Sequence, residues 1–270
     1  MTDLKRLLLD RATVVAPRLL GGVLATVNEG GESVGLRITE VEAYEGALDP
    51  GSHAYRGVTP RTRPMFGAPP RVYVYLSYGI HSCLNIVCAP EGSGQGCLVR
   101  AGEVVWGSDL MAKRRPKARS NRDWARGPGN VGSALGVSVA DSDHVLELRT
   151  IPPKWDSFVA SGADASSLND SREINADEGD ADARVRELFA PKSRLTLYLP
   201  QVEARAASDD AAGAPRGRAG VALPGGHPEY RTTARIGVSG PGGDGQKYPW
   251  RFYLVGERSV SRHPTPKSEK

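Results

Sequence analysis

The sequence predicts a protein of the α+β class, in which antiparallel hairpins, short helices and long loops alternate. Two pairs of strand patterns, within residues 24–44 and 72–88, are each joined by a turn, as in β-hairpins. Helical spacing of apolar residues occurs only over short stretches. The chain has 270 residues with 32 Gly and 20 Pro, so loops and turns take up much of it.

The N-terminal residues predict two short helices and then a hairpin. Leucines recur at helical spacing early in residues 3–20, and Thr13 is placed to cap a second helix that stops at Gly21. The β-branched and apolar residues of 24–27 and 37–44 form the two strands, and the polar residues between them form the turn.

The second of these strands, 37–44, carries two carboxylates. Side chains alternate between the faces of a strand, so Ile38, Glu40, Glu42 and Tyr44 are expected on one face. A buried carboxylate is costly unless it is paired or used in chemistry. This stretch alone is equally compatible with an exposed face held by salt bridges and with a catalytic carboxylate.

A long loop and a clear hairpin follow. Residues 45–71 show neither helical nor strand spacing, and a loop of this length is usually functional or disordered. Its Arg, His, Met and Phe residues argue against disorder. Residues 72–77 and 81–88 predict two paired strands with Tyr78 at the tip. A large aromatic at a hairpin tip is more typical of a contact residue than of a core residue.

A strand at 96–101 and a helix that Ser108 caps and that runs to about Arg115 are predicted next, and the chain then becomes basic. Between 113 and 126 a single acid accompanies seven cations, which suits contacts with phosphates. These cations are Lys113, Arg114, Arg115, Lys117, Arg119, Arg122 and Arg126. Residues 127–136 predict a turn and a short helix, whose N-terminal amides could also hold a phosphate.

The C-terminal half predicts further strands separated by polar stretches. The strands are expected at 145–151, 194–199, 235–238 and 251–255. Residues 163–183 and 203–226 offer little to bury and are expected to be flexible insertions. The predicted organisation is a single domain over 1–262 with a tail at 263–270.

Composition limits the class of protein. The net charge of +4 permits an anionic partner without requiring one. Cys83, Cys88 and Cys97 do not have the number or spacing of a disulfide framework, a zinc site or an iron–sulfur cluster, so reduced thiols in the cytoplasm are expected. The N-terminus lacks the long apolar run of a signal peptide or a membrane span.

A set of motifs, taken in order, points to one family. The motifs are Glu40-Val41-Glu42-Ala43-Tyr44, Ser52-His53, Thr59-Pro60-Arg61-Thr62-Arg63-Pro64-Met65-Phe66, Val72-Tyr73-Val74-Tyr75-Leu76-Ser77-Tyr78-Gly79, Leu84-Asn85, Leu98-Val99-Arg100-Ala101, Gly127-Pro128-Gly129, Arg235-Ile236-Gly237-Val238 and Trp250-Arg251-Phe252-Tyr253. In order and spacing they resemble the alkyladenine (3-methyladenine) DNA glycosylase family, over about residues 15–140 and 230–262.

The resemblance implies a fold and a reaction. The expected fold is a single mixed domain around a curved antiparallel sheet. The expected reaction is removal of alkylated and deaminated purines from duplex DNA in base excision repair, without a metal or a cofactor. No lysine amine is placed for a Schiff base by the resemblance, so the enzyme is expected to leave an abasic site without nicking the strand.

The resemblance also implies catalytic residues. Glu42 corresponds to the residue that activates water, and Arg100 to its partner in holding that water, with the main-chain carbonyl of Val238 as a further contact. An arginine next to Glu42 would keep that carboxylate ionised. Glu40 is the competitor for the role of base, and we favour a structural role for it.

Further residues are expected to recognise the base. By resemblance, Tyr44, His53 and Tyr75 form the walls of the base pocket, and Asn85 disfavours a guanine with its exocyclic amino group. A base inside a duplex must be flipped out to be reached. Tyr78, at the hairpin tip, is expected to fill the resulting gap in the stack.

The expected partner is double-stranded DNA containing damaged purines. Contacts with its backbone are expected from Arg61, Arg63, Lys113, Arg114 and Arg115. A monomer located in the cytoplasm is expected, associated with the nucleoid if the source is bacterial, and no membrane interaction is expected.

Two alternatives remain open at this point. The first is a sugar glycoside hydrolase, because Glu40 and Glu42 on one strand are roughly 6.5–7 Å apart, within reach of the separations that glycosidases use. The basic run and the lack of a Trp-rich cleft argue against it. The second is a non-catalytic module that binds nucleic acid, with steep salt dependence and no sensitivity to Glu42→Gln.

Overall fold

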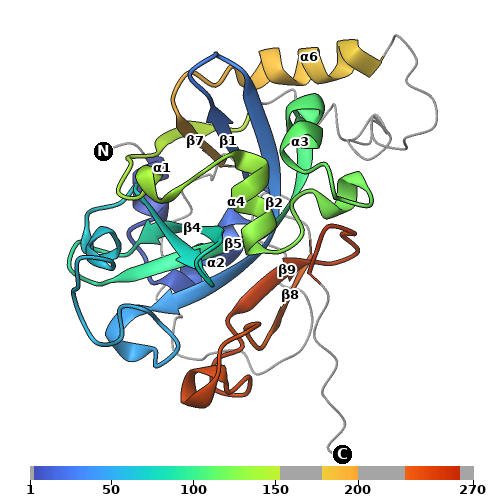
Figure 1. Ribbon diagram of the computed structural model, residues 1–270. Coiled ribbons are helices and arrows are strands. Elements are labelled where there is room, and N and C mark those ends of the chain that lie inside the picture. Colours follow the sequence, from blue (N-terminus) through green and yellow to red (C-terminus); the bar gives the residue numbers. More distant parts are fainter. Residues whose placement is uncertain (1–2, 153–177, 200–228, 262–270) are drawn as a thin grey trace, which may run out of the picture.

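The computed structural model describes residues 3–152, 178–199 and 229–261, and Figure 1 shows their arrangement. Most of the first predicted insertion, 163–177, the whole of the second, 203–226, and the tail, 263–270, lie outside the described residues. The remaining residues of the first insertion, 178–183, begin a helix.

One mixed sheet organises the described part of the chain and confirms the α+β class. Its strands are β1 (Val23–Val27), β2 (Ser33–Glu45), β3 (Val72–Ser77), β4 (His81–Cys88), β5 (Gln95–Trp106), β6 (Glu147–Thr150), β7 (Leu195–Leu199), β8 (Tyr230–Thr233) and β9 (Arg251–Leu254). The order is β3-β4-β5-β2-β1-β7-β6, with β9 also paired to β2, and β8 to β9. The pairs are antiparallel except β6–β7, which is parallel.

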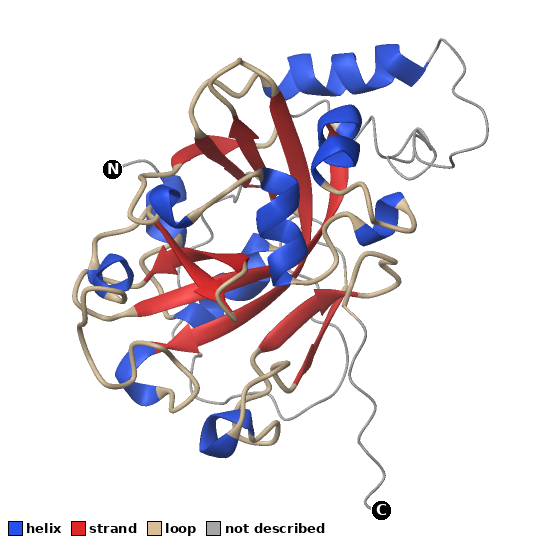
Figure 2. Ribbon diagram, in the orientation of Figure 1, coloured by secondary structure: helices blue, strands red, loops and turns tan. Residues whose placement is uncertain are grey.

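Short helices cover the curled sheet (Figure 2). They are α1 (Asp3–Leu7), α2 (Ala12–Leu19), α3 (Ser108–Arg114), α4 (Pro128–Leu135) and α6 (Glu178–Phe189), with single 3-10 turns at Gly46–Leu48, Arg63–Phe66, Asn121–Asp123, Val139–Asp141 and Gly240–Gly243. Helix α4 packs tightly on β4, because a Cβ at Gly132 would lie 1.9 Å from the carbonyl oxygen of Ser82. None of the helices among the described residues is long and apolar enough to cross a membrane.

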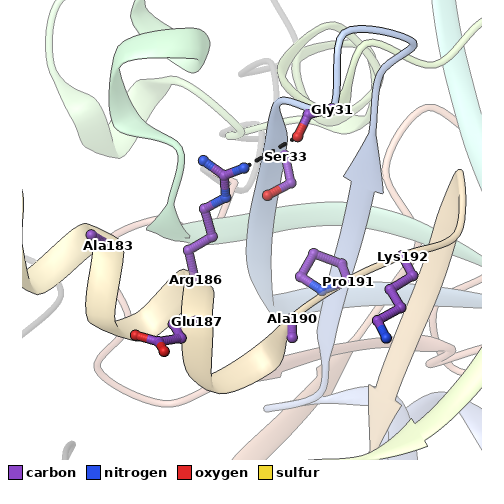
Figure 3. Close-up of a pocket in the computed structure, with 8 residues that line it drawn as sticks. All are labelled: Gly31, Ser33, Ala183, Arg186, Glu187, Ala190, Pro191 and Lys192. Carbon is purple, nitrogen blue, oxygen red and sulfur yellow. Dashed lines mark hydrogen bonds between the residues drawn. The ribbon is translucent and has the colours of Figure 1, made fainter.

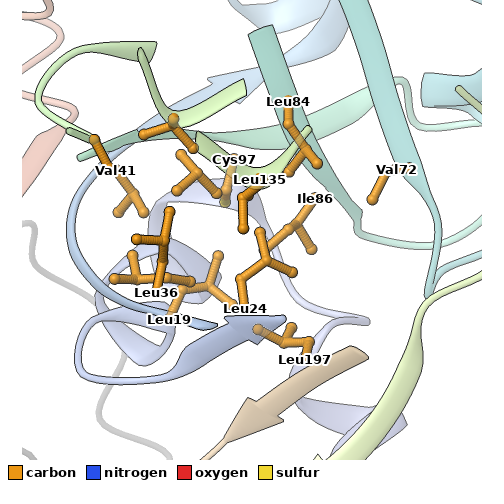
Figure 4. Close-up of a cluster of buried hydrophobic side chains, with 14 of the residues drawn as sticks. Leu19, Leu24, Leu36, Val41, Val72, Leu84, Ile86, Cys97, Leu135 and Leu197 are labelled. Atoms are coloured by element: carbon orange, nitrogen blue, oxygen red, sulfur yellow. The ribbon is translucent and has the colours of Figure 1, made fainter. Parts of the chain in front are cut away.

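The core lies between these helices and the sheet. Figure 4 shows part of it, where Leu19 from α2 and Leu135 from α4 meet Leu36 and Val41 from β2. Burial of an apolar side chain of this size contributes roughly 1.5–3 kcal/mol. The long strand β2 is buried along most of its length, so it is held rigidly from both sides.

A pair of irregularities in β2 and β5 changes the predicted alternation. The register runs from Ile38 opposite Gly102 to Glu40 opposite Ala101, which leaves Thr39 as an extra residue. It then continues with Val41 opposite Val99, which leaves Arg100 as an extra residue on β5. Such bulges redirect side chains. Ile38 therefore joins the core with Val41, and the prediction that it shares a face with Glu40 and Glu42 is wrong.

Three local predictions are also wrong. Helix α2 starts at Ala12, and the Thr13 hydroxyl donates to Glu45 at 2.5 Å instead of capping the helix. Ser108 is the first residue of α3, and Gly107 stands at the cap position with a φ of 82°. Residues 235–238 form a bend with no strand partner, and the strand that the sequence suggested there lies earlier, as β8.

Candidate active site

A cavity of about 520 Å³ opens where β2, β3, β4 and β5 meet two loops. The predicted pocket residues line it: Tyr44, His53, Tyr75, Asn85, Tyr78, Arg100 and Val238. These residues come from segments far apart in the sequence, so the fold brings the predicted site together. Residues 50–53 and 236–239 close two of its sides.

Glu42 lies directly behind the wall of this cavity and is fully buried. Its Oε2 accepts hydrogen bonds from the Tyr44 hydroxyl at 2.8 Å and from Nη1 of Arg100 at 3.2 Å. Its Oε1 accepts a hydrogen bond from the backbone N–H of Ile236 at 2.7 Å. All three donors belong to residues that line the cavity. The carboxylate is therefore fixed at the edge of the site.

Burial sets the protonation of Glu42. It raises the pKa of the Glu42 carboxyl above its ordinary value, and the positive charge of Arg100 and the hydrogen bonds from Ile236 and Tyr44 oppose this. The neighbouring Glu40 raises the pKa further. A carboxyl whose pKa is raised, fixed at the edge of a cavity, suits a general base.

Arg100 joins the two carboxylates of β2. Its Nε donates to Oε1 of Glu40 at 3.0 Å, while its Nη1 donates to Glu42. Burial lowers the pKa of the Arg100 guanidinium, but the charges of Glu42 and Glu40 outweigh this, so its pKa is raised. The bulge in β5 places this arginine where it meets both carboxylates.

Glu40 is fully buried as well, but its other partners lie away from the cavity. Oε1 accepts a hydrogen bond from Nε of Arg251 at 2.6 Å, and Oε2 accepts one from the backbone N–H of Ser261 at 2.6 Å. Two arginines and an amide thus hold Glu40 in the structure. A glycosidase needs two carboxylates that both face the sugar, so this arrangement does not favour that alternative.

An aromatic wall faces the carboxylate side of the cavity. Tyr73 and Tyr75 stack with ring centroids 5.6 Å apart, and the His53 ring meets Tyr75 edge-on at 4.6 Å. Nδ1 of His53 lies 3.1 Å from the Tyr73 hydroxyl. Sequence reasoning missed Tyr73, although the alternation of β3 places Tyr73 on the same face as Tyr75 and could have identified it.

The titrating groups of this wall are neutral near pH 7. Partial burial and the nearby charge of Arg61 lower the pKa of His53, so its imidazole is uncharged. Burial, followed by the neighbouring Cys83, raises the pKa of Tyr75 above its ordinary value. Burial and the Glu42 carboxylate raise that of Tyr44. Neutral rings provide π-faces without adding charge to the site.

Asn85 and Tyr78 mark the floor and the mouth of the cavity. Asn85 is buried, and its Nδ2 donates to the carbonyl of Tyr73 at 3.1 Å, which fixes the orientation of its amide. Tyr78 is 94% exposed at the tip of the β3–β4 hairpin, with a φ of 52°. Its ring therefore stands in solvent, where a partner could meet it.

The cations expected at the DNA backbone differ in their surroundings. Arg61 is exposed and lies with its Cζ 5.4 Å from the centroid of Tyr75, and Arg63 and Lys113 are also exposed. Arg114 donates to the carbonyl of Ala134 at 2.9 Å, and Arg115 to that of Trp124 at 3.2 Å. These last two arginines tie loops together, and contact with DNA stays a prediction for all five.

Sequence reasoning missed the contact from residues 235–238 to Glu42. It named the Val238 carbonyl as a contact of the water, and Val238 does line the cavity, but the group of this segment that bonds to the carboxylate is the amide of Ile236. The motif Arg235-Ile236-Gly237-Val238 was the only signal available. A backbone amide carries no signature in its side chain, so only the fold reveals this donor.

A second cavity, of about 490 Å³, lies between α6 and the β1–β2 turn (Figure 3). Arg186 reaches across it and donates to the carbonyl of Gly31 at 3.2 Å, with Glu187 and Lys192 nearby. Among the described residues that line it there is no aromatic ring. The first cavity is therefore the one suited to binding a base.

In the part of the chain that the structure describes, no cluster of three or more His, Cys, Asp or Glu residues is placed to hold a metal ion. The three cysteines are buried, and none of them is in a disulfide. Cys83 lines the base cavity next to Tyr75, where burial raises the pKa of its thiol.

The α+β fold thus places a buried carboxylate behind a cavity that is lined by aromatic rings and bordered by an exposed tyrosine. Comparisons with known proteins identify the family. The family model described as methylpurine-DNA glycosylase matches residues 6–166. The chain belongs to this family, and its reaction is hydrolysis of an N-glycosyl bond of a damaged purine in DNA.

Relatives with curated names extend the similarity to most of the chain. A protein from Leifsonia xyli is 39% identical over 258 residues, covering 93% of this chain and 88% of the relative. One from Cutibacterium acnes is 52% identical over 51% of this chain and 69% of its own length. One from Frankia casuarinae is 60% identical over 47% of this chain and 57% of its own length. Each carries a provisional name as a 3-methyladenine DNA glycosylase.

Proposed function

We propose that this protein flips an alkylated or deaminated purine out of duplex DNA into the Glu42 cavity and hydrolyses its N-glycosyl bond there. The observation that carries the proposal is the placement of Glu42. Its carboxylate is fully buried, and its three hydrogen-bond donors, from Arg100, Tyr44 and Ile236, all line the cavity.

The arrangement supports Glu42 as the general base. A carboxylate has about four acceptor positions, and three of those of Glu42 are occupied, which leaves one for a water molecule. Glu42 takes a proton from this water, whose oxygen bonds to C1′ of the sugar while the C1′–N bond to the base breaks. The bonding electrons leave with the base. The negative charge near C1′ favours the oxocarbenium-like transition state.

The aromatic wall supports binding of the flipped base. Stacking on a side-chain ring contributes roughly 1–3 kcal/mol per base. Cationic alkylated purines gain more on an electron-rich face, and the neutral state of His53 avoids repelling them. The fixed amide of Asn85 is placed at the floor, where it disfavours a guanine with its exocyclic amino group.

Tyr78 is the wedge in this proposal. A flipped nucleotide leaves a gap whose cost is a few kcal/mol of lost stacking. Tyr78 is exposed and lines the cavity mouth, so its ring can enter the duplex while the base enters the pocket. Arg61, next to Tyr75, is placed for a backbone phosphate. We infer a monomer that works on DNA in the cytoplasm, associated with the nucleoid if the source is bacterial.

The test is base release from defined duplexes. Duplexes with hypoxanthine, ethenoadenine or methylated adenine are incubated with the wild type and with Glu42→Gln, and abasic sites are then cleaved with alkali. We expect cleavage with the wild type only after alkali, because the enzyme does not nick the strand. Tyr78→Ala is expected to keep its fold and to lose excision from duplex more than from single-stranded DNA. If the wild type released none of these bases, the proposal would be overturned.

A further inference from the structure

The loop that contacts Glu42 is not held by a strand ladder. Residues 234–239 provide four of the residues that line the cavity, and the Ile236 N–H donates to Glu42 at 2.7 Å. The strand that precedes this loop, β8, ends at Thr233. Another feature of the fold must therefore fix the amide of Ile236 in place.

Arg235, the residue before Ile236, makes the connections that hold this loop. It is 5% exposed, and its Nη1 donates to the carbonyl of Ala43 at 3.0 Å and to Oδ2 of Asp49 at 2.5 Å. Its Nη2 donates to Oδ1 of Asp49 at 2.7 Å and to the carbonyl of Gly242 at 2.8 Å. One guanidinium thus links the loop to β2, to residues 46–52 and to the turn at 240–243.

Asp49 is an anchor for this contact. It is fully buried, and its two oxygens also accept hydrogen bonds from the backbone N–H groups of Gly51 at 2.9 Å and Glu45 at 3.2 Å. A bidentate pair of arginine and carboxylate fixes orientation as well as distance. The position of Arg235 is therefore set on both sides.

Arg235 also supports Tyr44. Its Cζ lies 4.6 Å from the centroid of the Tyr44 ring and 5.2 Å from that of Trp250. The hydroxyl of Tyr44 is the second uncharged donor to Glu42. Both uncharged donors to the carboxylate, the Ile236 amide and the Tyr44 hydroxyl, thus depend on the placement of one arginine.

We propose that Arg235, held by Asp49, is a positioning residue for excision, which keeps the Ile236 amide and the Tyr44 hydroxyl against Glu42. This inference rests on the role proposed above for Glu42. Arg235 donates no hydrogen bond to Glu40 or Glu42, so its contacts reach Glu42 through the two donors, while its charge interacts with Glu42 from a distance.

The ionisation of Glu42 gives a readout that a purely structural role does not move. The charged and titratable groups around it are Arg100 from β5, Glu40 and Tyr44 from β2, Arg235 from the loop and Tyr75 from β3. The hydrogen bonds from Ile236 and Tyr44 lower the pKa of Glu42. Their loss raises it, so the acidic limb of the rate profile moves to higher pH.

The experiment is single-turnover excision from a hypoxanthine duplex across pH, with the amount of folded enzyme measured by circular dichroism. For Arg235→Met we expect a maximal rate lower by about 10–100-fold and an acidic midpoint higher by about half a unit to one unit. Arg235→Lys keeps the charge but not the bidentate contact, and it is expected to recover part of both effects.

Two further variants keep the test decisive if Arg235→Met does not fold. Asp49→Asn weakens the anchor and leaves Arg235 in place. In Gly51→Ala the new Cβ would lie 2.6 Å from Nη2 of Arg235 and 2.7 Å from Cγ1 of Val238, so it displaces the loop without removing a charge. Both are expected to move the midpoint to higher pH.

Arg37→Lys is the matched control. Arg37 also bridges segments far apart, through Glu103 and Glu257, but has no contact with the Glu42 site. Its profile is expected to keep the wild-type midpoint. If the wild type shows no acidic limb, or Glu42→Gln stays active, the proposed function is wrong. If the limb depends on Glu42 but no Arg235, Asp49 or Gly51 variant moves it, only the present inference is overturned.

Discussion

Glu40 and Glu42 lie two residues apart on β2, and both are fully buried and bonded to Arg100, yet their surroundings differ. Glu40 has a second arginine and the amide of Ser261, on the side of β9. Glu42 shares a single arginine and otherwise has the Tyr44 hydroxyl and the Ile236 amide, on the side of the cavity.

The difference shows how one strand can carry a structural and a reactive carboxylate together. A buried carboxylate that is paired with two cations stays in its place, because breaking either ion pair would leave an unpaired buried charge, which is strongly unfavourable. A carboxylate with one shared cation and two uncharged donors next to a cavity keeps the capacity to take a proton. The partners, and not the residue type, separate the two roles.

The largest effect is expected for Glu42→Gln. The variant keeps the size of the side chain but removes the base, so the excision rate should fall by about 10²–10⁴-fold. Single-turnover excision measures it. The fold should be retained, since Gln can still accept hydrogen bonds from Tyr44 and Arg100. A variant with near wild-type excision would break the comparison.

Glu40→Gln is expected to act on stability. It leaves Arg251 and part of Arg100 without a counter-charge, at a cost on the order of 3 kcal/mol. For a domain of this size, that lowers Tm by roughly 6–12 °C. Thermal unfolding followed by circular dichroism measures the shift. A Tm equal to that of the wild type would show that Glu40 does not hold the β2–β9 connection.

The pH dependence of stability sharpens the comparison. Since burial raises the pKa of Glu42 in the folded state, the unfolded chain loses this proton first as pH rises. The contribution of Glu42 to the free energy of unfolding therefore decreases as pH rises from the ordinary pKa to the raised pKa, and it is constant at higher pH. Urea unfolding of the wild type and Glu42→Gln between about pH 4 and 8 should show the variant gaining relative stability with rising pH. If Glu42→Gln instead lost stability relative to the wild type with rising pH, the pKa of Glu42 would be lowered in the folded state.

The smallest effect is expected for Tyr44→Phe. The ring stays in the wall of the pocket, but the hydrogen bond of its hydroxyl to Glu42 is lost. That bond lowers the pKa of Glu42, so the acidic limb of excision should move up by about one unit. At neutral pH the rate should change by less than about tenfold. A midpoint displaced to lower pH would contradict the assigned hydrogen bond.

Local patterns predicted much of the fold. The β3–β4 hairpin and helix α4 follow from alternation, turn residues and glycine signals, which act within a few residues of the chain. The predicted strand at 235–238 failed because its apolar and β-branched character says nothing about a partner. Arg235 and Asp49 hold that segment from positions 186 residues apart.

The sequence predicted which residues belong to the candidate site but not how they are arranged. The resemblance named Glu42, Arg100 and the pocket tyrosines, and the structure brings them together. From the sequence, a bulge or strand end near Val41 is expected only on the condition that one of the two carboxylates alone faces the pocket. The positions of the bulges, at Thr39 and Arg100, depend on the pairing of β2 with β5. The bulges turn Arg100 toward both carboxylates. Because Glu40 and Glu42 share this arginine, their different roles follow from their other hydrogen-bond partners.

The most direct test of the account compares Glu40→Gln and Glu42→Gln side by side. Single-turnover excision from a hypoxanthine duplex is measured per folded molecule, at a temperature well below both unfolding transitions. Glu40→Gln is expected to stay within about tenfold of the wild type, while Glu42→Gln is expected to lose at least about 10²-fold. Loss of excision in Glu40→Gln with full activity in Glu42→Gln would contradict it.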